Sequence, residues 1–136
     1  MKLDLEFIKE ILLAIEAETG SRASLSSVMV ALKIEASNEA KLDILAGHIR
    51  LMRDAGFIES TAADCGIMSN INRPVAAIHT GAQYEITLSG YQMLDGLRND
   101  NWMGKIKSYL SEIGISGLKK APGFVIGLAT QHMMKS

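Results

Sequence analysis

Apolar residues in the N-terminal half of the chain recur every three or four positions, which is the spacing of amphipathic helices. The first such segment runs from Leu3 to about Glu18 and ends before a glycine. A short second helix is expected to start at a cap formed by Ser24 or Ser26. A third helix is predicted from a Ser37 cap to about Ala55, where Gly56 supplies the left-handed residue that ends many helices.

Alternation of apolar and polar residues replaces the helical spacing after this third helix. Phe57–Ser60 and Gln83–Thr87 alternate in this way, so they are predicted to pair as an antiparallel hairpin beside the third helix. Residues 61–82 between them are rich in glycine and asparagine and are predicted to form a long wing loop. Further helices are expected over Ser89–Arg98, over Trp102–Ile113 and from Pro122 onward.

This order of elements predicts a mainly α fold with a small β-hairpin, namely a winged helix-turn-helix with extra C-terminal helices. We expect a single domain over residues 1–136, with its core in residues 3–98 and a helical extension in residues 102–134. The core is predicted from the repeating apolar positions of these elements, which are Leu12, Ile15, Leu45, Ile49, Met52, Ile58, Ile86 and Leu94.

Composition is that of an ordinary globular protein. Hydrophobic residues make up 48% of the chain and charged residues 21%, so a chain of this length can bury a core. No apolar run approaches the roughly 18 residues that a membrane-spanning helix needs, and the N-terminus does not resemble a signal peptide. The single cysteine, Cys65, excludes an internal disulfide and fits a reducing compartment. We therefore expect a cytoplasmic protein with no membrane contact.

The net charge of −1 is unevenly distributed along the chain. Residues 1–64 carry 7 Lys and Arg against 11 Asp and Glu, whereas residues 65–136 carry 7 against 4. A dedicated nucleic-acid-binding protein usually presents a strongly basic face, which gains affinity from counterion release. The composition of this chain does not predict such a face.

Three stretches of the chain resemble one known family. They are KLDLEFIKEILLAIEA at the start, HIRLMRDAGFIES in the middle and ITLSGYQMLDGLRNDNWMGKIKSYL toward the end. They are similar to matching segments of the family called domain of unknown function 2513, small proteins of bacteria and their phages. Gly96, Asn99 and the long wing depart from the family pattern. The resemblance implies a winged-helix fold and a phage or mobile-element setting, and it implies no activity.

Residue types that carry catalysis or bind metals are scattered through the sequence. His48, His79 and His132 fall in a predicted helix, a loop and the tail, and no pair has the spacing of a metal site. Cys65 has no flanking base that would activate its thiol. Phosphate-binding loops and nucleophile elbows are missing as well. We therefore expect neither an enzyme nor a cofactor.

DNA binding is the function that a winged helix suggests, with the third helix as the reading element. On a helical wheel, the face opposite its core side carries three carboxylates and one guanidinium, from Glu39, Asp43, Asp54 and Arg50. This face repels phosphate. Contacts to double-stranded DNA are therefore expected from Lys41 and His48 on its flank, from Arg50 and from Arg73 in the wing. The alternative, that these are solvated side chains, stays open.

A protein-interaction adaptor is the second candidate function, since the fold alone does not decide between partners. The last helix is apolar around most of its circumference, through Phe124, Val125, Ile126, Leu128, Met133 and Met134. Either the domain's own core buries this helix or a homodimer does, through the first, fifth or last helix.

Overall fold

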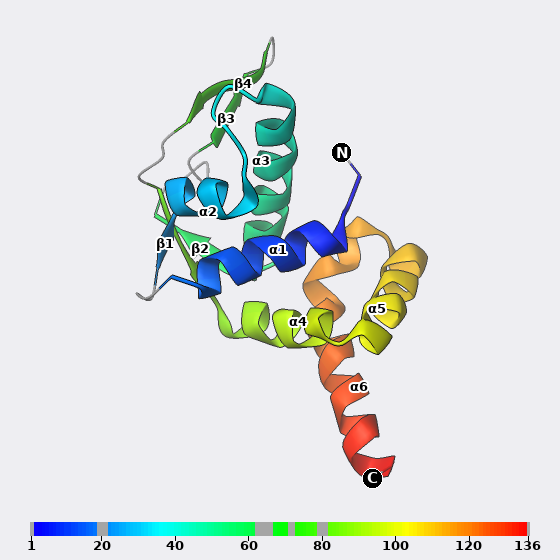
Figure 1. Cartoon of the computed structure of the whole chain (residues 1–136). Coiled ribbons are helices and arrows are strands. Elements are labelled where there is room, and N and C mark those ends of the chain that lie inside the picture. The colour runs from blue at the N-terminus through cyan, green and yellow to red at the C-terminus, as the bar shows by residue number, and fades with distance from the viewer. Residues whose placement is uncertain (1, 19–21, 62–66, 71–72, 79–81, 136) are drawn as a thin grey trace.

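The computed structural model describes residues 2–18, 22–61, 67–70, 73–78 and 82–135 of the chain. Within these ranges the protein is mainly helical and has a small antiparallel sheet (Figure 1). In chain order the elements are α1 (Leu5–Glu16), β1 (Ala23–Ser24), α2 (Leu25–Leu32), α3 (Glu39–Asp54), β2 (Ile58–Ser60), β3 (Ile67–Asn70), β4 (Arg73–Ile78), β5 (Gln83–Ile86), α4 (Leu88–Arg98), α5 (Asp100–Ile113), the 3-10 helix η1 (Ile115–Lys120) and α6 (Ala121–Lys135).

Short polar side chains set the start of several helices. The Ser24 hydroxyl accepts a hydrogen bond from the Ser27 amide, which selects Ser24 of the two predicted caps of α2. The cap of α3 is Asn38, whose side chain accepts from the Lys41 amide, so the prediction of Ser37 is wrong by one residue. Gly56 follows α3 with a φ of 84°, the left-handed conformation expected of it.

A single residue, Asn99, separates α4 from α5. It ends α4, and its side chain accepts from the amides of Asn101 and Trp102 at the start of α5. An asparagine can serve both ends because its extended backbone stops one helix while its side-chain oxygen caps the next. The predicted break over residues 99–101 is therefore shorter than expected.

The predicted strand pair is confirmed, and it belongs to a three-stranded sheet in the order β1-β5-β2. β2 and β5 run antiparallel with Ile58 opposite Ile86, which points both side chains into the core. β1 was not predicted. Its two residues pair with the other edge of β5, with Ala23 opposite Tyr84.

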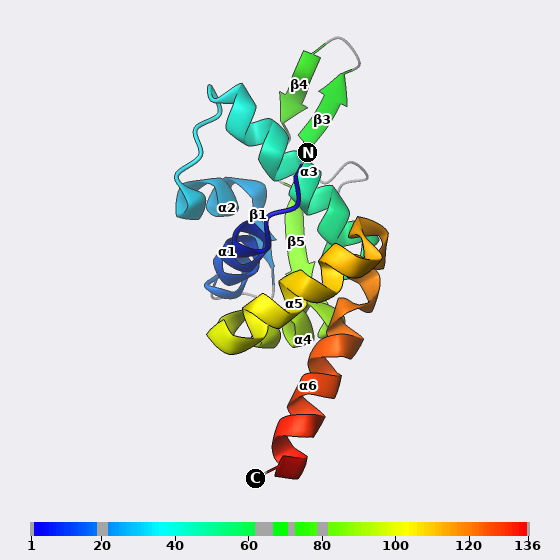
Figure 2. The ribbon, with the colours of Figure 1, turned by 90° about the vertical axis from the view of Figure 1, so that its right-hand side faces the viewer.

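The prediction of a loop over residues 61–82 is wrong for its middle part, where β3 and β4 form an antiparallel hairpin. Both strands lie along α3, and Figure 2 shows the hairpin extending past the N-terminal end of that helix. The base of the segment is closed on the sheet. The Thr61 amide donates to the Gln83 carbonyl at 3.0 Å, and the Gln83 amide donates to the Thr61 hydroxyl at 3.0 Å.

All eight predicted core residues are buried in one continuous cluster. Tyr84 and Phe57 are also fully buried there. Helix α4 closes the sheet side of this core at Gly90, because a Cβ at that position would lie only 2.1 Å from the Phe57 carbonyl oxygen. The crossing of α4 over the end of the sheet therefore requires a glycine.

Helix α6 begins against α4 and α5 and then runs away from the rest of the molecule (Figures 1 and 2). Val125 of α6 packs into the position that a side chain at Gly96 of α4 would occupy, at 2.6 Å from its ideal Cβ. In the described part of the chain, no helix has the length and apolar character to cross a membrane.

Candidate nucleic-acid interface

Helix α3 and the β3–β4 hairpin lie side by side at one end of the molecule, at the opposite end from α6 (Figures 1 and 2). The hydrophobic side of α3 is buried by the core, through Leu42, Leu45, Ile49 and Met52. This packing leaves the other side of the helix accessible next to the hairpin.

Lys41 is exposed in the first turn of α3, where the helix dipole favours an anion. Arg50 is partly buried and takes part in contacts of its own. The two residues are nine positions apart, which is about half a turn around the helix. The structure thus does not bring Lys41 and Arg50 onto one surface.

Arg73 starts β4 and pairs with Asn70 across the hairpin, at the end where the two strands join. Its side chain lies outside the described part of the structure, as do the side chains of Asn70 and His132 and the whole of Cys65, Asn72 and His79. The backbone therefore places Arg73 at the hairpin tip, and the direction of its guanidinium stays a prediction.

His48 is a correction to the predicted site, because it is fully buried. Its Nε2 accepts a hydrogen bond from the Asp4 amide at 3.1 Å, and its Nδ1 lies 2.9 Å from the Ile44 carbonyl oxygen. Nε2 can accept only when it carries no proton, so the Nδ1–H tautomer donates to Ile44. The ring also meets Phe7 edge-on, with centroids 5.1 Å apart. His48 therefore ties the start of α1 to α3 and cannot touch DNA.

The residues that carry the family resemblance are mostly framework residues. The Thr87 hydroxyl accepts from the Gly90 amide at 3.1 Å and donates to the Gly56 carbonyl, joining α4 to the end of α3. Arg98 forms an ion pair with Glu16 of α1. These contacts hold α1, α3 and α4 together, so these residues of the shared motif contribute to the fold.

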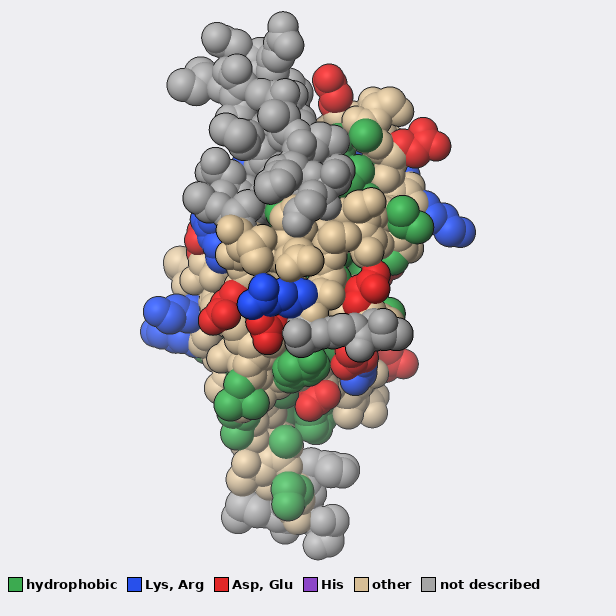
Figure 3. All heavy atoms as spheres, turned by 90° about the vertical axis from the view of Figure 1, so that its left-hand side faces the viewer, with side chains coloured by type: hydrophobic (Ala, Val, Ile, Leu, Met, Phe, Trp, Pro, Cys, Tyr) green, Lys and Arg blue, Asp and Glu red, His purple; other side chains and the backbone are tan. Residues whose placement is uncertain are grey.

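Charges around α3 are balanced. From Lys33 to Asp54 the chain has four Lys or Arg and four Asp or Glu. Arg53 is partly neutralised by Asp54, with Nη2 3.2 Å from the carboxylate, and the exposed Glu39 and Asp43 lie on the same side of the helix as Arg50. Figure 3 likewise shows acidic and basic side chains intermixed on one face of the molecule.

Two exposed apolar residues near this end were not singled out from the sequence. Val30 of α2 is 74% exposed and Ile44 of α3 is 49% exposed. The wheel of α3 contains the signal for Ile44, since it lies outside the stripe formed by Leu42, Leu45 and Ile49.

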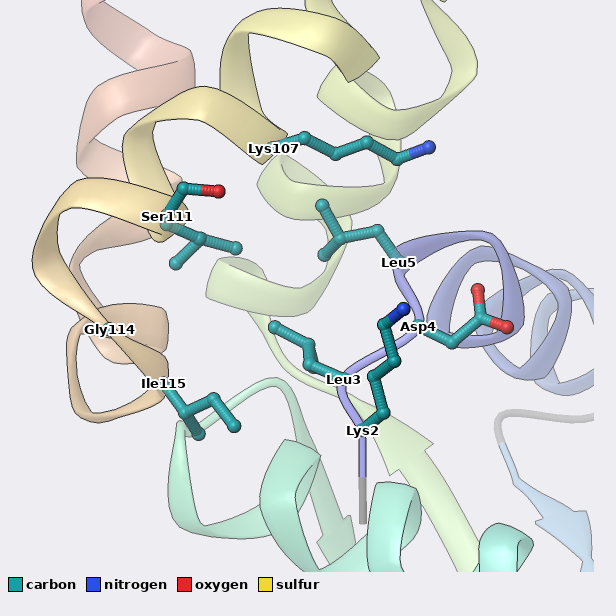
Figure 4. A pocket seen from close by; sticks show the side chains of 9 residues that line it. Lys2, Leu3, Asp4, Leu5, Lys107, Ser111, Gly114 and Ile115 are labelled. Carbon is teal, nitrogen blue, oxygen red and sulfur yellow. The ribbon is translucent and has the colours of Figure 1, made fainter.

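A hollow of about 690 Å³ lies between the N-terminal segment and α5 (Figure 4). Leu3, Leu5 and Ile115 give it apolar walls, and the Lys107 and Ser111 side chains come from α5 (Figure 4). None of its described lining residues is a histidine or a cysteine, and Asp4 is used as the cap of α1. Among the described residues, no three His, Cys, Asp or Glu side chains gather as a metal ion would require.

Comparison with known proteins gives a match to a family model. No curated protein and no solved structure matches the chain. A family model described as "Hypothetical protein (DUF2513)" matches residues 2–116, which cover every element from α1 to α5, whereas α6 lies outside the match. The chain thus belongs to the family of hypothetical proteins called domain of unknown function 2513, as its three motif segments indicate.

Proposed function

We propose that this protein is a winged-helix DNA-binding regulator of transcription. The supporting observation is the side-by-side arrangement of α3 and the β3–β4 hairpin at one end of the molecule. The order helix, strand, two helices, strand, hairpin, strand supports the winged-helix assignment, as does the sheet order β1-β5-β2. In such a fold α3 enters the major groove and the hairpin contacts the neighbouring backbone or minor groove.

Two cations carry the proposed contacts to the duplex. Lys41 lies at the N-terminal end of α3, where the positive end of the helix dipole adds a second favourable interaction with a phosphate. Arg73, whose backbone lies at the hairpin tip, is the cation proposed to contact the adjacent DNA backbone. Arg50 lies on the acidic side of α3, so it contacts the duplex only if α3 rotates about its own axis in the groove. We expect weak non-specific affinity, since few phosphates are neutralised.

Fluorescence anisotropy with a labelled random duplex tests this proposal. Binding is measured at several salt concentrations for the parent and for Lys41→Ala and Arg73→Ala. Each variant should weaken binding about equally on all sequences and lower the salt slope by about one. Lys119→Ala is the matched control, because Lys119 is an exposed residue of η1, far in sequence from α3 and the hairpin. This variant should bind like the parent. No binding by the parent at low salt would refute the DNA-binding function.

A protein-interaction adaptor is the second candidate, and the acidic side of α3 favours it. Glu39, Asp43 and Ile44 are all exposed on α3, and such acidic and apolar side chains suit a basic, partly apolar protein better than a phosphate backbone. Retention of a basic protein partner by the parent but not by Ile44→Asp, without any DNA binding, would support the adaptor. The phage or mobile-element setting rests on the family resemblance, and the cytoplasmic setting on the lone cysteine.

A further inference from the structure

Among the described residues, His48 is the one fully buried side chain of a type that titrates near neutral pH. Both of its ring nitrogens are occupied, because Nδ1 lies 2.9 Å from the Ile44 carbonyl oxygen and Nε2 lies 3.1 Å from the Asp4 amide nitrogen. A carbonyl can only accept a hydrogen bond and an amide can only donate one, so Nδ1 carries the proton and Nε2 does not. This arrangement requires a neutral ring.

The groups that face the ring offer no replacement partner for a protonated Nε2. In α3, the residues one turn before and one turn after His48 are uncharged, and Phe7 of α1 meets the ring edge-on. The Asp4 carboxylate accepts from the Phe7 amide as the cap of α1, and Figure 4 shows it turned toward that helix. Lys2 and Lys107 line the hollow beside Asp4, and two cations do not stabilise a charged imidazole.

The segment before α1 is lightly attached to the rest of the protein. Among the described residues, Lys2 and Leu3 make no hydrogen bond or ion pair, and Leu3 is only half-buried. Asp4 accepts hydrogen bonds from α1 through its carboxylate and its carbonyl oxygen, but its amide donates to His48 of α3. The bond to His48 is therefore the polar contact that holds residues 2–4 on α3.

We propose that residues 2–4 form an acid-released latch, which is held on α3 by neutral His48 and released when the ring takes up a proton from solvent. Protonation converts the accepting lone pair of Nε2 into an N–H group that faces the Asp4 N–H group, so the hydrogen bond is lost. It also places a charge in a fully buried position, which is costly without a partner. Movement of the latch relieves both effects, because it opens the ring to water.

The direction of the pH dependence follows from which state binds the proton. A histidine in water takes up its proton around roughly pH 6.5. The released state can bind this proton and the latched state cannot, so a falling pH favours release. Well above this pH the ring is neutral in both states, and the latch then does not respond to pH.

Release of the latch changes the hollow of about 690 Å³ between the N-terminal segment and α5 (Figure 4). Lys2, Leu3 and Asp4 form one wall of this hollow, and Lys107 and Ser111 of α5 belong to the other. When the latch leaves α3, the hollow loses the first wall. The latch thus couples solvent pH to the shape of this surface, and it does not depend on whether the protein binds DNA.

Amide hydrogen exchange of the full chain, followed by NMR spectroscopy at about pH 7.5 and about pH 5.5, tests the latch. Protection factors are compared, so the pH dependence of the exchange chemistry itself cancels. The protection factor of the Asp4 amide should fall about tenfold in the parent at the lower pH, because a proton bound only in the released state shifts the opening equilibrium by that factor. The protection factor of the Leu94 amide, in the core, should not change.

His48→Gln separates the proton from the hydrogen bond. Glutamine offers an acceptor oxygen and a donor nitrogen but does not titrate, so Asp4 protection in this variant should be the same at both pH values. His132→Gln removes a histidine of α6 and is the matched control, which should respond to pH like the parent. If His48→Gln does not fold, the ¹⁵N shifts of the His48 ring in the parent supply the same test. Nε2 should gain its proton over the pH range in which Asp4 loses protection.

Several results would overturn the latch. Asp4 protection that is independent of pH in the parent would show that no release occurs, and an equal fall in His48→Gln would assign the effect to another group. A tenfold fall at Leu94 as well would mean that the whole domain opens. A ring that takes up its proton while Asp4 stays protected would show that the hydrogen bond does not depend on the neutral ring.

Discussion

Glycine 90 illustrates how one residue fixes the crossing of two elements. The ideal position of a Cβ on Gly90 lies 2.1 Å from a backbone oxygen and 2.7 Å from the Ile86 side chain. A backbone oxygen cannot move aside as the end of a flexible side chain can. Any side chain at this position must therefore push α4 away from the end of the sheet.

We expect Gly90→Ala to lower the free energy of unfolding by about 1–3 kcal/mol, the usual cost of overpacking a core. Gly104→Ala is the matched control in a neighbouring helix. A Cβ there meets nothing within 4 Å, so alanine should be neutral or stabilise the helix. Urea denaturation of the two variants measures the difference. Equal midpoints would show that α4 does not approach Phe57 and Ile86 as closely as described.

His48 gives a second prediction, because its two hydrogen bonds join segments that are far apart in sequence. In His48→Leu the ring is replaced by an apolar side chain of smaller size, which leaves the Asp4 amide and the Ile44 carbonyl without this partner. We expect a loss of about 1–3 kcal/mol in unfolding free energy. Under conditions where the variant is folded, its affinity for DNA should equal that of the parent. A folded variant with normal stability but weaker DNA binding would restore His48 to the interface.

At the scale of elements, local patterns predicted the helices, the strand pair and the core. The repeats of Leu45, Ile49 and Met52 within α3 and the alternation of Ile58 and Ile86 are properties of neighbouring residues, so a sequence displays them. The predicted pairing of β2 with β5 succeeded because burial of one face fixes the register.

Features that depend on distant partners were missed. β1 has two residues and exists because β5 offers an open edge. Strand β4 contains proline and alanine within Arg73–Ala77, and these residues weaken the sequence pattern of a strand. The β3–β4 hairpin also packs against α3, a partner outside the hairpin. His48 falls on the flank of α3 by periodicity, but the N-terminal segment folds back and covers it. Of the predicted contact residues whose side chains the structure describes, Lys41 is exposed, Arg50 is partly buried and His48 is fully buried.

Helix α3 provides a matched pair of substitutions that tests its orientation. We expect Ile49→Ala to lower the unfolding free energy by about 2–5 kcal/mol, because its side chain is fully buried. Ile44→Ala removes the same atoms from a side chain that is 49% exposed and should cost much less. Thermal or urea denaturation distinguishes them. Similar losses for both would mean that the buried side of α3 is misassigned.

At the scale of the whole molecule, the balance of charge around α3 limits the proposed DNA binding. Glu39 and Asp43 are exposed in the N-terminal half of α3, on the side that carries Arg50 and away from Lys41. Replacing them by Gln and Asn in one variant should tighten binding to a random duplex, because two repulsive charges are removed. The gain should diminish as salt rises. Glu112→Gln, an exposed residue of α5, is the control and should leave affinity unchanged. If the double variant does not bind more tightly than the parent at low salt, α3 does not approach the phosphates.

The closed base of the segment between β2 and β5 has a consequence for how such proteins diversify. Two hydrogen bonds join Thr61, which precedes the hairpin, to Gln83, which follows it. They close the sheet at the base of the hairpin segment. Lengthening a segment anchored in this way costs little, about 0.6 kcal/mol for each doubling. The length of the hairpin can therefore change at little cost to the sheet at its base. Relatives can alter its length and sequence, and with them the surface presented beside α3, while the core that the shared motif builds keeps its packing.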